Sequence, residues 1–137
     1  PASILTLMGC IAGDSSAATP RLLSKITSES GLPAGIISTP TSTIGWKSST
    51  CETLQAMMRN NVEQTYGQDQ FGDLAVCAKS GTAEVGSDQA PHAWFVGFID
   101  DVAHPYAFVS VVENGGGGAS VSGKIIATVL NQLCEEG

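Results

Sequence analysis

Three apolar runs in the second half of the chain constrain its fold more than any other feature. They extend over Leu74–Glu84, His92–Asp100 and Tyr106–Glu113, and they have the length and the residue types of β-strands. The connections between them are too short for a crossover helix, so neighbouring strands must pair antiparallel. Both alternating sets of side chains in the last two runs are apolar, which predicts a sheet covered on both faces.

Helical periodicity precedes and follows these runs. Apolar residues recur at helical spacing from Pro1 to about Gly13, from Thr50 to Gly67 and from Val121 to Leu133. The sequence Ser49-Thr50-Cys51-Glu52 has the form of a capping box and predicts the start of the middle helix. Helices packed on an antiparallel sheet of about three main strands make the predicted fold class α+β.

The region between the first two predicted helices has no sustained period. We expect a short extended segment over Thr19–Ile26, followed by a connection over Thr27–Trp46 that is rich in Ser, Thr, Gly and Pro. One short strand is predicted at Gly35–Ser38. A connection of this length is unusual in a compact domain and indicates a surface loop beside a site.

The composition is that of a globular protein of about one domain. Of the 137 residues, 42% are hydrophobic and 14% are charged, so a core can form. The formal net charge of −7, without a cluster of Lys and Arg, argues against a nucleic-acid partner. No apolar run approaches the roughly 18–20 residues of a membrane span. Because the chain begins at Pro1 inside an apolar periodic segment, we expect it to be an internal piece of a longer polypeptide.

The cysteines predict neither a metal site nor a clear disulfide framework. Three pairings are possible among the four, and the sequence does not choose between them: Cys10, Cys51, Cys77 and Cys134. Since three of the four lie in apolar periodic segments, we favour reduced, buried thiols. His92 and His104 lack ligand-like spacing to any cysteine, so no zinc site and no other cofactor is expected.

The candidate site lies at the end of the first strand-like run, at Lys79-Ser80-Gly81-Thr82. Lys79 supplies a positive charge suited to an anionic ligand. Ser80 and Thr82 share one face of a strand while Gly81 points away, and the absence of a side chain at Gly81 allows close packing behind the strand. A backbone N–H such as that of Thr82 can stabilise an oxyanion by about 3–4 kcal/mol. The alternative is that these polar residues only protect an exposed edge strand from aggregation.

Other polar residues are weaker candidates. His92 borders the cleft or is an ordinary polar residue at a strand end, and we favour the latter. The segment from Glu113 to Gly118 is either a flexible rim or a tight turn, and we favour the turn. His104-Pro105 is typical of a turn, and Asp100-Asp101 is expected at a solvated hairpin tip.

The lysine motif is one of three signatures of penicillin-recognising serine enzymes, together with S-x-x-K and S-x-N. The segments Val76–Glu84, His92–Phe98 and Val111–Gly118, in this order, resemble the end of a penicillin-binding protein transpeptidase domain. The helices from Pro1 to Asp14 and from Thr50 to Gly67 fit the same resemblance, which covers essentially the whole chain. It implies that residues 1–137 are the C-terminal part of such a penicillin-binding, β-lactamase-like domain, and an incomplete one.

The resemblance also implies roles for the motif residues by position. Lys79 would set the electrostatics of the site and attract the terminal carboxylate of the substrate. Ser80 and Thr82 would hydrogen-bond that carboxylate along the strand that contains Gly81. The N–H of Thr82 would be one of two oxyanion donors.

The nucleophile of such an enzyme is missing from the sequence. No lysine has a serine three residues before it, since these positions hold Leu22, Ile44, Val76 and Val121. No asparagine has a serine two residues before it either. In the family both signatures lie upstream of the equivalent of Pro1, so we expect residues 1–137 alone to be inactive.

The implied function is that of a peptidoglycan D,D-transpeptidase, which cross-links stem peptides ending in D-Ala-D-Ala by acyl transfer and is acylated by β-lactams. It implies a bacterial cell-surface protein, anchored by an N-terminal membrane helix outside this segment. The expected partner is the upstream half of the same domain, with dimerisation or domain swapping as another way to cover apolar surface. Two alternatives stay open: a fragment of a serine β-lactamase or D,D-carboxypeptidase, and a non-catalytic β-lactam-sensing module.

Overall fold

The computed structural model describes residues 1–21, 23, 25–35 and 37–135. The helices are α1 (Ala2–Ala12), α2 (Ser48–Asn61) and α3 (Lys124–Glu135), with the helical turns η1 (Val62–Tyr66), η2 (Gln68–Phe71) and η3 (Gly118–Gly123). The strands are β1 (Ser16–Ala18), β2 (Ile26–Thr27), β3 (Pro33–Gly35), β4 (Thr41–Thr43), β5 (Val76–Ala83), β6 (His92–Ile99) and β7 (Ala107–Val112). None of the described helices is long and apolar enough to cross a membrane.

The main sheet has the strand order β5-β6-β7, and both pairings are antiparallel. The register places Lys79 opposite Val96 and Ser80 opposite Phe95. On the other side of β6, Phe95 lies opposite Ser110 of β7. The predicted α+β class and the antiparallel order of the three main strands are therefore confirmed.

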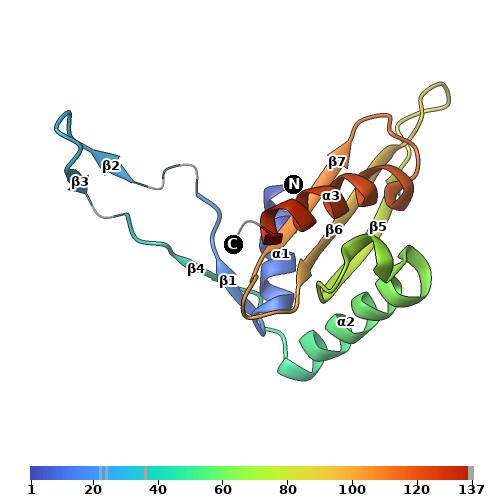
Figure 1. Ribbon diagram of the computed structural model, residues 1–137, viewed down its shortest axis with the longest axis horizontal. Helices are drawn as coiled ribbons and strands as arrows, with labels where there is room; N and C mark the ends of the chain where they lie inside the picture. The colour runs from blue at the N-terminus through green and yellow to red at the C-terminus, as the bar shows by residue number, and fades with distance from the viewer. Residues whose placement is uncertain (22, 24, 36, 136–137) are drawn as a thin grey trace.

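Helices cover both faces of this sheet, as the apolar character of β6 on both sides predicted (Figure 1). On one face, Phe95 is fully buried against α3, and its ring stacks on those of Phe71 and Phe108 at centroid distances of 6.3 and 6.2 Å. On the other face, Met8, Ile11 and Met58 of α1 and α2 form a second cluster with two residues of the sheet, Cys77 and Phe98. Burying each large side chain contributes about 1.5–3 kcal/mol, so β6 is the centre of the fold.

The region between α1 and α2 differs from its prediction. β1 pairs with β4, while β2 and β3 form a small antiparallel ladder in an arm that leaves the body of the protein on the side away from β5 (Figure 1). A single strand at 35–38 was wrong, because the residues that pair lie at 33–35 and 41–43; Ile36 lies outside the described residues. Strands of two or three residues carry no periodicity that a sequence pattern can reveal.

The start of α2 also differs from its prediction. The helix begins at Ser48, with Lys47 at the N-cap position and no side-chain capping hydrogen bond. Ser49 is already inside the helix, so the predicted capping box does not form. Instead, the Ser48 hydroxyl donates to Glu52 Oε1 at 3.3 Å, a contact between residues four apart on one helical face.

Gly97 in the centre of β6 provides a test of this packing. A Cβ atom there would lie 2.1 Å from the Cys77 carbonyl oxygen and 2.8 Å from Phe108 Cζ. Because the first neighbour is backbone, Gly97→Ala must displace β5, and we expect it to lower the free energy of unfolding by about 1–3 kcal/mol in urea titrations followed by circular dichroism.

The matched control is Gly35→Ala in the arm, where the nearest atom to a new Cβ is 4.0 Å away. This substitution should change stability by no more than about 0.5 kcal/mol. Equal effects of the two substitutions would contradict the packing described for β6.

Candidate functional site

The outer edge of β5 forms the frame of the candidate site. The Asp100 N–H donates to the Ala75 carbonyl oxygen, so Ala75 and every second residue after it direct their backbone groups toward β6. The intervening residues of β5 therefore direct their N–H and C=O groups to the free edge. Lys79 is on one face of the strand, whereas Ser80 and Thr82 share the other, as the alternation predicted.

Side chains from α2 hydrogen-bond to the backbone along the first part of this edge. Arg59 Nη1 donates to the Val76 carbonyl at 3.0 Å, and Asn61 Nδ2 donates to the Ala78 carbonyl at 3.2 Å. Arg59 also pairs with Glu63 at 3.0 Å. The backbone of β5 is thus held by polar side chains up to the residue that precedes Lys79.

Tyr66, the last residue of η1, meets the edge at Ser80. Its hydroxyl accepts from the Ser80 N–H at 2.9 Å and donates to Ser80 Oγ at 3.0 Å. Its ring packs edge-on against Phe95, with a centroid distance of 5.2 Å. Sequence reasoning missed Tyr66; the available signal was a tyrosine directly before Gly67, where the predicted helix ends beside the lysine strand.

Lys79 is exposed and bends over the same edge. Its Nζ donates to the Ser80 carbonyl oxygen at 2.6 Å. A small cavity of about 330 Å³ lies here, lined by the whole motif and by side chains from α1 and β6: Ile4, Lys79, Ser80, Gly81, Thr82, Ala83, Trp94 and Val96. The structure therefore brings all four predicted site residues to one cavity.

Thr82 presents its backbone to solvent. It is exposed, and its N–H has the same edge-facing orientation as that of Ser80. No side chain in the described parts of the chain accepts a hydrogen bond from this N–H. The edge thus offers an ammonium group and a free N–H within a few residues, an arrangement that can bind an anion.

The close packing expected behind Gly81 also depends on another glycine. A Cβ on Gly118 would lie 2.4 Å from the Gly81 carbonyl oxygen and 2.5 Å from that of Trp94, so η3 can approach the sheet only because residue 118 has no side chain. A Cβ on Gly81 itself would lie 3.2 Å from Trp94 Cβ, which is tight but less restrictive. Close packing at Gly81 therefore agrees with the expectation, and Gly118 is a second glycine on which it depends.

The glycine-rich segment beside the site is a tight turn, as favoured from the sequence. Asn114 has a φ of +53° and donates its N–H to His92 Nδ1 at 3.0 Å. The Gly116 N–H donates to the Pro91 carbonyl oxygen at 2.9 Å. His92 therefore anchors this turn to the start of β6, in agreement with the structural reading of this residue.

Cys77 is unsuited to act as a nucleophile although it lies two residues before Lys79. Burial, and secondarily the charge of Asp100, raise the pKa of its thiol to about 11. The thiol is therefore neutral near pH 7 and unreactive. All four cysteines are free, and Cys10, Cys51 and Cys77 are buried as expected. The described residues contain no group of three or more His, Cys, Asp and Glu side chains able to hold a metal ion.

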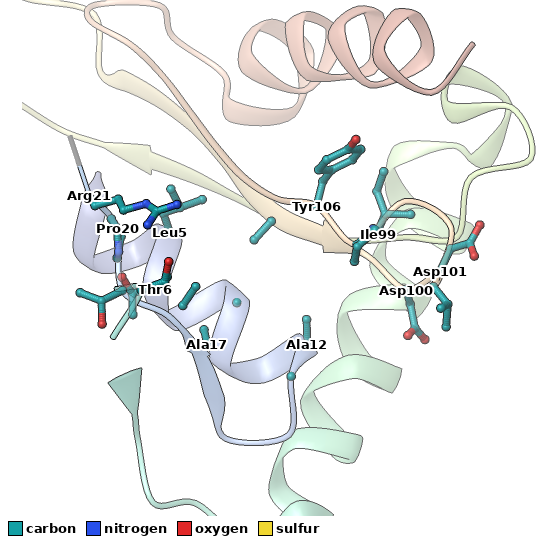
Figure 2. Close-up of a pocket in the computed structure, with 18 residues that line it drawn as sticks. Leu5, Thr6, Ala12, Ala17, Pro20, Arg21, Ile99, Asp100, Asp101 and Tyr106 are labelled. Carbon is teal, nitrogen blue, oxygen red and sulfur yellow. The ribbon is translucent and has the colours of Figure 1, made fainter. Parts of the chain in front are cut away.

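A larger cavity of about 840 Å³ lies at the other end of β6 (Figure 2). One wall comes from α1, β1 and the segment that reaches Arg21, and the other from the end of β6 with Asp100 and Asp101. The residues that line it include no Ser, Cys, His or Lys and none of the residues of the lysine motif. The small cavity at Lys79 therefore remains the candidate site.

Comparisons with known proteins agree with this geometry. The family described as Penicillin binding protein transpeptidase domain matches residues 1–133. Penicillin-binding protein A from M. tuberculosis, as its ceftriaxone acyl-enzyme complex, is similar with a TM-score of 0.81 and 21% identity, over 93% of this chain and 30% of that chain. No curated protein sequence matches.

Two further solved structures show the same similarity. The D,D-transpeptidase domain of a peptidoglycan glycosyltransferase from Eggerthella lenta has a TM-score of 0.77 and 21% identity, over 97% of this chain and 31% of that chain. PBP2 from Pseudomonas aeruginosa in complex with WCK 5153 has a TM-score of 0.72 and 23% identity, over 96% of this chain and 28% of that chain. The chain therefore spans less than a third of each structure, and the likeness shows the fold.

The buried Cys77 thiol predicts a loss of stability at high pH. Its pKa is raised from 9.0 to about 11 in the folded protein, so between these values the unfolded chain releases a proton that the folded chain retains. The free energy of unfolding should fall as the pH rises from 9 to 11. Urea unfolding across this range should show a smaller fall for Cys77→Ala than for the wild type, and parallel curves would contradict the assignment.

Proposed function

The chain belongs to the penicillin-binding protein transpeptidase family, and on this premise we propose that residues 1–137 form the C-terminal part of a D,D-transpeptidase domain. Its substrate is a peptidoglycan stem peptide that ends in D-Ala-D-Ala, and β-lactams acylate the same site. The observation that carries this proposal is the edge of β5, where the Lys79 ammonium group and the edge-facing Thr82 N–H adjoin one cavity.

In the proposed mechanism this edge binds substrate and stabilises charge. Lys79 attracts the terminal carboxylate, which also accepts hydrogen bonds from the hydroxyls of Ser80 and Thr82. A serine oxygen attacks the penultimate carbonyl, so that an ester bond forms, the amide bond breaks and a proton passes to the departing D-Ala amine. The N–H of Thr82 donates to the oxyanion that develops, a contribution of about 3–4 kcal/mol for such donors.

The reacting serine belongs to a segment outside residues 1–137 in this proposal. The support is the absence of both S-x-x-K and S-x-N from the sequence. The exposed side chains of Ile125, Val129 and Leu133 on the outer face of α3 also support a partner for this helix, and we assign that role to the upstream half of the same domain. The substrate places the whole protein at the extracytoplasmic surface, with its membrane anchor outside this segment.

The alternatives share the lysine motif and differ in what happens to the acyl-enzyme. A β-lactamase hydrolyses it rapidly, a carboxypeptidase transfers it to water, and a sensor keeps it. The match of residues 1–133 to a transpeptidase family favours transfer to an amine.

Labelling with a fluorescent penicillin tests the location of the nucleophile. We expect the longer protein that contains residues 1–137 to be labelled covalently at a serine of the preceding segment, as peptide mass spectrometry can show. The isolated 137-residue chain should remain unlabelled, because it has no serine with a lysine three residues later. Covalent labelling of this chain would refute the proposal.

Lys79→Ala in the longer protein tests the lysine. Removing a charged hydrogen-bond partner of the carboxylate costs about 1.5–3 kcal/mol, so the second-order rate constant for acylation should fall about 10- to 100-fold while the protein stays folded. Lys47→Ala, at the exposed N-cap of α2, is the matched control and should leave the rate unchanged. An unchanged rate in the Lys79 variant would contradict a role in binding the carboxylate and would leave this residue only the role of protecting an edge strand from aggregation.

A further inference from the structure

The hydrogens shared by Tyr66 and Ser80 can be assigned from their chemistry. The Ser80 N–H can only donate, so the Tyr66 hydroxyl oxygen is the acceptor in the 2.9 Å contact. In the second contact the Tyr66 hydroxyl is the donor and Ser80 Oγ the acceptor, at 3.0 Å. Ser80 Oγ is therefore an acceptor in this pair, and its own hydrogen is available for a different partner.

No acceptor for that hydrogen lies within the part of the chain that the structure describes. Ser80 is half-buried, lines the small cavity and has its carbonyl oxygen engaged by Lys79 Nζ at 2.6 Å. Lys79 and Ser80 line the same small cavity, so its rim presents a lysine ammonium group and one serine hydroxyl hydrogen. A carboxylate, which accepts hydrogen bonds only, is the ligand group that fits both donors.

The Tyr66 side chain is fixed by its neighbours, and this determines the direction of its hydrogen bond to Ser80 Oγ. Its ring contacts Phe95 edge-on at 5.2 Å, and Phe95 is fully buried between Phe71 and Phe108. Gln70 Nε2 donates to the Tyr66 carbonyl oxygen at 2.6 Å. The phenol hydroxyl is therefore anchored from behind by the aromatic cluster and at the main chain by η2.

We propose that Tyr66 is a positioning residue that holds the Ser80 hydroxyl as a hydrogen-bond donor toward the carboxylate of the substrate or β-lactam. This inference rests on the proposed function, which supplies the ligand. Tyr66 does not touch the reacting atoms. It acts through Ser80 by two hydrogen bonds. The Tyr66 hydroxyl donates one to Ser80 Oγ, and its oxygen accepts the other from the Ser80 N–H, which fixes the strand edge beside Lys79.

Tyr66→Phe in the longer protein tests the proposal, because it removes one oxygen and keeps the ring against Phe95. Acylation is measured with a penicillin and with its carboxylate methyl ester, which lacks the negative charge. We expect the second-order rate constant to fall about 3- to 10-fold for the carboxylate, the effect of one hydrogen bond, and to fall less for the ester, whose neutral carbonyl oxygen is a weaker acceptor. The ratio of the two rates does not depend on the fraction of protein that is folded.

Two further variants separate positioning from a general structural effect. Tyr106→Phe removes a hydroxyl at the larger cavity and should change neither rate. In a Ser80→Ala background, Tyr66→Phe should cause no additional loss, since the two residues act as one unit. An unchanged carboxylate rate, an equal fall for both ligands, or a full additional loss in the Ser80→Ala background would each overturn the role of Tyr66. A wild-type protein that no penicillin acylates would instead overturn the proposed function.

Discussion

The antiparallel pairing of β5 with β6 is the constraint on which the rest of the structure depends. This register decides which residues of β5 direct their backbone groups to the free edge, and therefore where the N–H of Thr82 lies. It also assigns Ser80 to the face of Phe95 and Lys79 to the face of Val96. A slip of one residue would exchange these faces and would turn the lysine toward the face that holds Tyr66 and Phe95.

The free edge of β5 differs between its first and its last residues. Along β5, side chains of α2 and η1 hydrogen-bond to the backbone as far as Ser80. Beyond that residue the edge is open, and the small cavity begins. Polar side chains therefore stabilise the strand and leave the part at the candidate site accessible, so an edge strand can offer a binding surface while most of its edge is protected.

Much of this architecture was predictable because it depends on local patterns. The three main strands and the helices around them follow from periodicities that extend over eight or more residues. The ladders β1–β4 and β2–β3 were not predictable, because strands of two or three residues contain too little pattern. Tyr66 and Gly118 were missed for a different reason: each acts on a partner far away in the sequence, Ser80 in one case and the backbone of Gly81 in the other.

The sequence by itself determined the α+β class, the antiparallel order of the sheet and the residues of the lysine motif, since residue type and spacing encode these directly. Only the tertiary structure decided that Lys79 bends over the edge to Ser80, that the Tyr66 hydroxyl donates to Ser80 Oγ and that η3 approaches the strand closely at Gly118. The last two of these contacts arise when η1 and η3 pack on the sheet. Hydrogen-bond direction and close approach are properties of that packing, and no single segment contains them.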